Sequence, residues 1–163
     1  MRKVFIAGAT VYLGRFLCAE YRRRGWHFAA LVQDRLRAGD IAADVLVQAE
    51  VTRPETLVGI MDGADLVVSA LGITRQADGL TYRDVDFRAK LNLLREAERA
   101  RVRRFVYVHV LNAQAMRHVP LIAAKAEFVD ALQASALPSS VIAPLGYFSD
   151  MGDILSMVRS GRV

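Results

Sequence analysis

The sequence has little cysteine and lacks any long apolar stretch. Its one cysteine, Cys18, allows neither an internal disulfide nor a metal site built from several thiolates. Cys18 lies among apolar residues of an expected helix, which favours a small buried side chain over a reactive thiol. No apolar stretch reaches the roughly 18 residues of a membrane span, and the one after Met1 is too short for a signal peptide. We therefore expect a cytoplasmic protein without a membrane partner.

Acidic residues are outnumbered, with 17 against 22 basic residues and a net charge of +5. The basic residues gather at 22–24 and 99–104, at the ends of expected helices, where the helix dipole favours cations. Aromatic residues do not alternate with them, so we do not expect a nucleic-acid partner. The three histidines show no ligand spacing, so we expect no metal site. Hydrophobic residues make up 53% of the 163, which indicates one folded domain over residues 1–163.

Short β-rich runs alternate with helical segments along the whole chain. We expect strands at 3–7, 27–32, 44–48, 65–70, 104–110 and 140–143. We expect helices at 12–24, 54–61, 85–101, 121–135 and 148–160. This alternation is typical of an α/β fold with a parallel sheet covered on both faces. Right-handed crossovers then favour a doubly wound Rossmann sheet in three α/β/α layers, with strand order 3-2-1-4-5-6.

A glycine loop from Gly8 to Gly14 joins the first expected strand to the first helix. Dinucleotide-binding proteins carry their fingerprint at this place. Gly8 would allow a tight turn, Gly14 would let the helix pack closely, and the first N–H groups of the helix would face a pyrophosphate. The middle position is Val11, whose branched side chain adds bulk and resists positive φ. Either the loop shifts and still binds, or the site has lost its ligand.

The end of the second expected strand bears on the choice of cofactor. Asp34 follows Gly14 by twenty residues, where a carboxylate would bond the ribose 2′-hydroxyl and favour NAD. Arg35 and Arg37 would instead pair with a 2′-phosphate and favour NADP. An ordinary polar loop explains the same residues, so the preference between NADP and NAD stays open.

Later segments make the pattern more specific. The segments that carry it are 69–76 (SALGITRQ), 85–87 (VDF), 91–94 (LNLL), 105–108 (FVYV), 110–113 (VLNA), 124–125 (AK) and 144–151 (PLGYFSDM). Together with the glycine loop they resemble the atypical short-chain dehydrogenases/reductases, and above all the NmrA-like, isoflavone-reductase-like branch that binds NAD(P)H. The resemblance implies a Rossmann fold, a dinucleotide cofactor, and hydride transfer to a small organic substrate. It also implies a substrate-binding portion that would follow Val163.

The resemblance places the cofactor on particular residues. It implies phosphate contacts along the glycine loop, at Gly8, Thr10, Val11, Tyr12, Leu13 and Gly14. The adenine-ribose side would involve Gln33, Asp34, Arg35, Glu50 and Val51. The end of the fourth strand would line the cofactor with Ser69, Ala70, Leu71 and Gly72. Pro144, Gly146 and Phe148 would flank the nicotinamide, and Lys125 would bond its ribose and assist proton transfer.

Several family positions carry different residues here. Val11 replaces a glycine, Gln33 an arginine, Ala89-Lys90 a Gly-Asn pair, and His109 a serine; Leu121 stands where ordinary members have a tyrosine, and Ala143 and Leu145 replace an arginine and a threonine. The changes gather on the cofactor side. Catalytic activity is therefore the open question.

Two residues are candidates for catalysis. Lys125 would act as a fixed positive charge that lowers the pKa of a neighbouring group, or it is simply a surface lysine on an apolar helix. His109, at the end of the fifth expected strand, has an ordinary pKa suited to general acid work near neutrality. The competing interpretation of His109 is a hydrogen-bonded packing residue.

Three functions follow from these observations. The first is an NAD(P)H-dependent oxidoreductase acting on a small molecule. The second is a regulator or assembly factor that senses the dinucleotide without turning it over. The third is a truncated member that has lost the cofactor and binds a partner or a second copy through its C-terminal end. That end would expose Leu145, Phe148, Ile154, Leu155 and Met157.

Overall fold

The computed structural model describes residues 1–72 and 79–161, apart from the side chains of residues 37 and 153. Six parallel strands form one sheet in the order β3-β2-β1-β4-β5-β6, which confirms the expected doubly wound topology. The strands are β1 (Lys3–Ala7), β2 (His27–Val32), β3 (Val45–Gln48), β4 (Leu66–Ser69), β5 (Arg104–Val108) and β6 (Ser139–Ile142). Their short apolar sequences suit strands that are covered on both faces.

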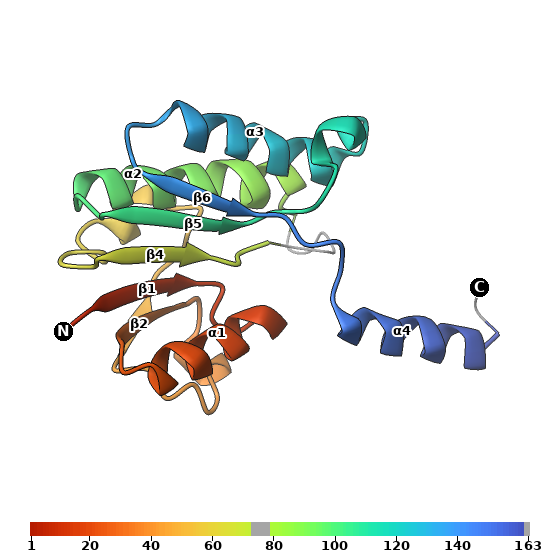
Figure 1. Ribbon diagram of the computed structural model, residues 1–163, viewed down its shortest axis with the longest axis horizontal. Coiled ribbons are helices and arrows are strands. Elements are labelled where there is room, and N and C mark those ends of the chain that lie inside the picture. The colour runs from red at the N-terminus through yellow and green to blue at the C-terminus, as the bar shows by residue number, and fades with distance from the viewer. Residues whose placement is uncertain (73–78, 162–163) are drawn as a thin grey trace.

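Helices cover the two faces of the sheet. The α-helices are α1 (Tyr12–Arg23), α2 (Lys90–Arg99), α3 (Pro120–Ala134) and α4 (Phe148–Arg159). Figure 1 shows α1 on one face and α2 and α3 on the other. A π-helical segment, η3 (Asp84–Ala89), leads directly into α2, and short 3-10 turns lie at η1 (Arg35–Arg37), η2 (Pro54–Leu57) and η4 (Ala113–Met116). The arrangement is the expected three-layer architecture.

Alternate residues of the strands fill two hydrophobic cores. Phe5 and Tyr107 point to the α2 and α3 face, where they pack with Phe128 in the larger core. Val4, Ile6, Phe28 and Val68 point to the α1 face. Cys18 lies in this smaller core, and burial raises the pKa of its thiol to about 11. The expectation of an inert buried cysteine is confirmed.

The expected helix over 54–61 is wrong. The chain forms only the 3-10 turn η2, because Val58 leaves the helical region and Gly59 adopts a φ of 85°. The other expected helices are present, although the one over 85–101 begins as the π-helical segment η3. The expected fifth strand is shorter, since β5 ends at Val108 and leaves His109 in the segment beyond the sheet.

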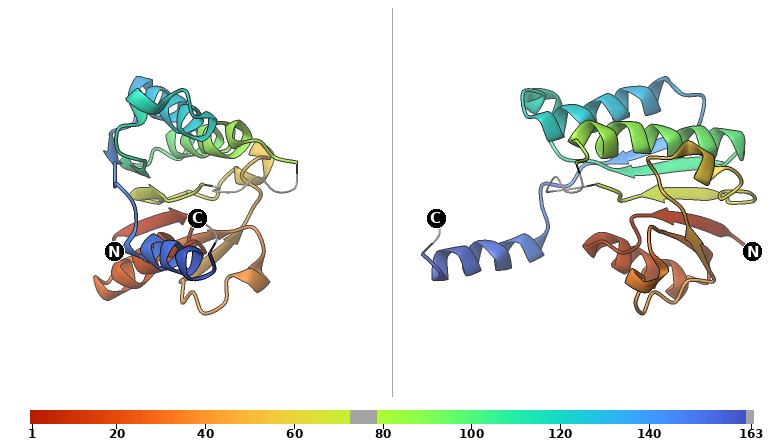
Figure 2. Two further views of the ribbon diagram at one scale, coloured as in Figure 1. Left: turned by 90° about the vertical axis from the view of Figure 1, so that its right-hand side faces the viewer. Right: turned by 180° about the vertical axis from the view of Figure 1, so that it is seen from behind.

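Helix α4 extends away from the sheet and its covering helices (Figures 1 and 2). Leu145 and Phe148, which precede and begin it, are 84% and 96% exposed. Ile154, Leu155 and Met157 are exposed along its length, as the sequence predicts. In the part of the chain that the structure describes, no helix combines the length and apolarity needed to cross a bilayer.

Candidate functional site

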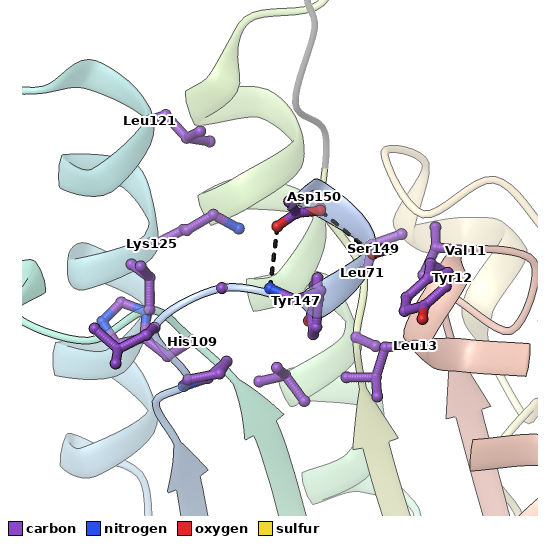
Figure 3. A pocket seen from close by; sticks show the side chains of 17 residues that line it. Val11, Tyr12, Leu13, Leu71, His109, Leu121, Lys125, Tyr147, Ser149 and Asp150 are labelled. Carbon is purple, nitrogen blue, oxygen red and sulfur yellow. Dashed lines mark hydrogen bonds between the residues drawn. The ribbon is translucent and has the colours of Figure 1, made fainter. Parts of the chain in front are cut away.

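A cavity of about 480 Å³ opens at the carboxyl edge of the sheet, near the point where strand order reverses between β1 and β4. Its lining comes from the segments that follow β1, β4, β5 and β6, and from α3 (Figure 3). Open α/β sheets bind their ligands at this kind of switch point. The volume falls within the range of about 300–1,000 Å³ that is usual for small-molecule sites.

The glycine loop packs against the end of β4 in a way that excludes side chains at two positions. Gly8 has a φ of 85°, and a Cβ there would lie 2.8 Å from the backbone of Ala70 and Leu71. A Cβ on Gly14 would lie 1.8 Å from the carbonyl oxygen of Gly8. Helix α1 begins at Tyr12, and no described side chain caps it. Its first N–H groups therefore suit an anionic ligand, so the loop fits a bound pyrophosphate.

Val11 occupies the loop without backbone strain. It has φ −79° and ψ 166°, which is ordinary extended geometry for a branched residue. The sequence suggests that a branched residue here would be strained by a positive φ. The structure shows no such strain, because the loop has a negative φ at this position. Its side chain borders the cavity beside Tyr12 and Leu13 (Figure 3). The bulk of its side chain is therefore the one feature of Val11, among those expected from the sequence, that bears on a ligand.

The expected adenine-ribose residues lie at the ends of β2 and β3. Gln33 donates a hydrogen bond of 2.7 Å from Nε2 to Oε2 of Glu50, which ties the two corners together. Burial alone would raise the pKa of the Glu50 carboxyl, but hydrogen bonds from Thr52 and Gln33 hold it below its ordinary value. Asp34 accepts from the backbone N–H of Leu36 at 2.9 Å. Their contacts with a ribose stay a prediction.

The side chain of one of the two candidate arginines after Asp34 is described by the structure. Arg35 donates from Nη2 to the carbonyl oxygen of Leu46 at 3.3 Å, a contact that turns its guanidinium toward β3. The side chain of Arg37 lies outside the described residues. Residues 73–76 of the family-like segment also lie outside the described part of the chain. The preference between NAD and NADP stays a prediction from Asp34 on one side and Arg35 and Arg37 on the other.

Lys125 is held at the edge of the cavity. Its side chain is 17% exposed, and Nζ donates to Oδ1 of Asp86 over 2.7 Å. The alternative of a solvated surface lysine is therefore wrong. Figure 3 shows the side chain leaving α3 toward the interior of the cavity. The ion pair fixes the position of the ammonium group.

Two fully buried charged residues behind Lys125 were not among the candidates from the sequence. Lys90 donates from Nζ to Oδ1 of Asp86 over 2.6 Å and lies 2.9 Å from the hydroxyl of Tyr107. Burial and the charge of Lys125 lower the pKa of Lys90 to about 7, although Asp86 acts in the opposite direction. The spacing of Asp86 and Lys90, four residues apart among apolar neighbours, is the one sequence signal for this pair.

His109 borders the cavity but lacks the properties expected of it. Its Nδ1 is buried and has no hydrogen-bond partner among the described residues, while its ring lies 5.5 Å from the ring of Tyr107. The structure thus supports packing for this residue but shows no hydrogen bond at Nδ1. Burial, followed by the charges of Lys125, Lys90 and Arg117, lowers its pKa to about 4. The imidazole is therefore neutral at pH 7. An imidazolium that serves as general acid near neutrality is not what this environment stabilises.

The cavity brings half of the expected site residues together. The expected residues that line it are Val11, Tyr12, Leu13, Ala70, Leu71, Gly72, His109, Lys125, Pro144 and Gly146. Phe148 lies outside this lining, because its side chain is in solvent, and Tyr147 takes its place (Figure 3). The rings of Tyr147 and Tyr12 lie 5.8 Å apart, so the start of α4 meets the glycine loop across the cavity.

Known proteins place this geometry in a family. A family model described as NAD(P)H-binding matches residues 8–154, from the first loop glycine into α4. The chain belongs to this NAD(P)H-binding family. The match covers the glycine loop, the segment with Asp86 and Lys90, and Lys125. It confirms the resemblance to NAD(P)H-binding proteins that the sequence motifs predict.

Individual relatives extend the comparison. Photosystem II assembly factor Ycf39 of Synechocystis sp. is 31% identical over 121 residues, which are 73% of this chain and 37% of that protein. The chloroplastic divinyl chlorophyllide a 8-vinyl-reductase of Zea mays is 28% identical over 98% of this chain and 44% of its own. This chain thus spans less than half of either relative. The Bordetella bronchiseptica enzyme WbmH, solved with NAD+, has a TM-score of 0.78 and 16% identity over 99% of this chain and 64% of its own.

Proposed function

We propose that this member of the NAD(P)H-binding family is an oxidoreductase that reduces a small organic substrate. The observation that carries the proposal is a cavity that has the start of α1 at one side and Lys125 at the other. A dinucleotide that lies across this edge of the sheet would place its pyrophosphate at the glycine loop and its nicotinamide near Lys125. When bound, the cofactor supplies the hydride.

Residues of the chain would hold and orient the cofactor. The N–H groups that open α1 would bind the phosphates, and the corner formed by Gln33 and Glu50 would face the adenosine. Lys125, fixed by Asp86, would bond the nicotinamide ribose. Its charge would lower the pKa of a hydroxyl or water beside it and so assist proton transfer. Pro144 would pack against the nicotinamide from the side of β6.

Titration calorimetry and a turnover assay test this proposal together. NADPH and NADH are titrated into the purified chain up to millimolar concentration, and oxidation of each is then followed with a panel of enones and carbonyl compounds. Binding with turnover supports an oxidoreductase. Binding without turnover on any member of the panel supports a dinucleotide-sensing role. Absence of binding overturns both.

Replacing Val11 by glycine is expected to tighten dinucleotide binding about tenfold, or about 1.4 kcal/mol. The isopropyl group borders the cavity at the loop, and its removal lets a pyrophosphate approach the backbone. Calorimetry with NADPH and NADH measures the change. Val58→Gly is the matched control, since Val58 is exposed, follows η2 and is not part of the cavity lining. Equal affinity for Val11→Gly and the wild type would show that the valine does not crowd the site.

A second candidate function is a non-catalytic role in binding a protein partner. The observation that favours it is the apolar face of α4, on which Met151, Ile154 and Leu155 are exposed. Removing such surface from water favours association. The relative from Synechocystis is named as an assembly factor, which is consistent with this role. For this chain we propose a second copy as the occupant of the α4 face.

The double variant Met151→Lys, Leu155→Lys is expected to convert a self-associating chain into a monomer. The two residues are one helical turn apart on the apolar face, so both charges would be buried on association. Light scattering after size-exclusion chromatography, over a range of protein concentrations, measures the mass. Ser156→Lys with Ser160→Lys adds the same charge at exposed polar positions and should leave association unchanged. A monomeric wild-type chain would contradict the proposal.

A further inference from the structure

When both lysines are protonated, the cluster behind the cavity carries more positive than negative charge. Nζ of Lys90 and Nζ of Lys125 lie 2.6 and 2.7 Å from the same atom, Oδ1 of Asp86. Among the residues that the structure describes, Asp86 is the one carboxylate within ion-pair distance of either lysine. Asp86 and Lys90 are fully buried. An excess charge at such a place is costly unless another ion pairs with it.

The cluster meets the cavity through Lys125. A Cβ on Gly72 would lie 3.0 Å from Nζ of Lys125 and 3.2 Å from Oδ1 of Asp86, and Gly72 borders the cavity. Because glycine has no side chain, Gly72 does not cover the ammonium group of Lys125. Lys90, further inside, has its contacts with Asp86 and Tyr107. A ligand in the cavity would therefore contact Lys125 directly, whereas Lys90 would act on the ligand only through its electrostatic interaction with Lys125 and Asp86.

The surroundings of the cavity are positive on one side and apolar on another. The pKa of His109 is lowered by burial and then by the charges of Lys125, Lys90 and Arg117, so the field at this edge is positive. Asp150 also borders the cavity, but its Oδ2 accepts from the backbone N–H of Tyr147 at 3.0 Å, and the residue is exposed on the first turn of α4. The apolar wall is formed by Val110, Leu121 and Leu145.

We propose that the cavity binds a small ligand that has an apolar body and a carboxylate, and that the carboxylate contacts Lys125. Lys90 is the positioning residue, because its charge beside Asp86 and Lys125 favours a second anion at this place. The inference rests on the proposed function in one respect, because it names the class of the substrate. A carboxylate at Lys125 would give two anions for two ammonium groups. Without it, the favoured state has a neutral Lys90, whose two N–H groups donate to Asp86 and to the hydroxyl oxygen of Tyr107.

Binding of the anion would therefore bring a proton onto Lys90. Burial and Lys125 hold the pKa of Lys90 near 7 in the free chain, and the added negative charge would raise it. Above pH 7 the ligand then binds with uptake of up to one proton, and its affinity falls by as much as about tenfold per pH unit. Below pH 7 Lys90 is already charged, so uptake disappears. Asp86, Lys125, Tyr107 and His109 are the titratable groups around it that belong to this equilibrium.

The test uses benzoate and its neutral counterpart benzamide as probes. Each is titrated calorimetrically into the full chain at pH 6 and pH 8, without cofactor, in two buffers of different ionisation heat. We expect benzoate to bind about tenfold more tightly than benzamide and to take up close to one proton at pH 8 but none at pH 6. Equal affinity of the two probes, or no binding of benzoate, overturns the proposal.

Lys90→Met separates the role of Lys90 from that of Lys125. The variant keeps the buried volume and leaves the ion pair between Asp86 and Lys125 in place, so it is expected to fold. We expect benzoate affinity at pH 6 to fall about tenfold, proton uptake at pH 8 to vanish, and benzamide binding to stay unchanged. Retained proton uptake overturns the role of Lys90. Lys90→Gln serves in the same measurements if the methionine variant is unfolded.

Asp150→Asn is the control for the carboxylate that lines the same cavity. It should not weaken benzoate binding, since it removes a negative charge and leaves the lysine cluster intact. A loss of benzoate affinity in this variant would place the anion elsewhere and overturn the proposal. The probes need no dinucleotide. Failure of NAD(P)H binding alone therefore counts against the proposed function, and failure of benzoate binding alone counts against the inference drawn here.

Discussion

Asp86→Asn is expected to lower the free energy of unfolding by about 3 kcal/mol at pH 6. The substitution preserves shape but removes the carboxylate that accepts from Lys90 and Lys125. Lys90 would then either keep its charge beside Lys125 in a buried position without a counter-charge or give up its proton, and both states cost free energy. Removing one partner of a buried pair costs more than the pair itself contributes, because the other charge stays desolvated. Urea denaturation of the variant and the wild type measures the difference.

The loss should shrink as the pH rises from 6 to 9. Lys90 has its pKa lowered to about 7 in the folded chain, and without Asp86 it would lie lower still. The folded variant therefore binds fewer protons than the folded wild type across this range, while the unfolded chains bind nearly the same number. The stability difference then decreases with pH. A constant difference at all pH values would show that the lysines do not carry the effect.

Glu127→Gln is the matched control for Asp86→Asn. Glu127 lies two residues from Lys125 on α3, and it pairs with Arg83, which directly precedes η3, at 2.9 Å. The same two elements are thus joined by one buried and one exposed ion pair. The exposed pair is expected to contribute less than about 1 kcal/mol, because water screens it. Equal losses in the two variants would contradict the burial argument.

The fold was predictable from the sequence because its signals are local and repeated. Runs such as 3–7 and 65–70 are apolar on both faces, as parallel strands must be, and the crossover rule then sets the order of the strands. The expected helix at 54–61 failed for an equally local reason. Its proline and apolar residues favour a helix, but Gly59 takes a left-handed conformation that ends it after one turn.

The candidate site was predictable only in part. The glycine loop could be recognised because its function depends on neighbouring residues in the chain. The buried cluster depends on four elements that meet in space, with Asp86 on η3, Lys90 on α2, Lys125 on α3 and Tyr107 on β5. Seen along the chain, an acid and a lysine four residues apart suggest a surface pair. The pKa of His109 could not be read from the sequence either, because burial and the charges of lysines far away in the sequence lower it below its ordinary value.

Gly14→Ala is expected to destabilise the chain by about 3 kcal/mol and to abolish dinucleotide binding at millimolar ligand. The added Cβ would lie 1.8 Å from the carbonyl oxygen of Gly8 and 2.9 Å from Cα of Ala9, both in the backbone. No flexible side chain can move to relieve these contacts, so α1 must shift away from β1. Urea denaturation measures the stability, and calorimetry with NADPH and NADH measures the binding.

Gly152→Ala separates this clash from the general effect of replacing a glycine in a helix. Gly152 lies within α4, and a Cβ there meets nothing within 4 Å, so alanine should be neutral or stabilising by up to about 1 kcal/mol. The two substitutions add the same methyl group to a helix and differ in what surrounds it. Wild-type stability and dinucleotide binding in Gly14→Ala would contradict this argument. They would show that the N–H groups at the start of α1 do not depend on close packing of α1 against β1.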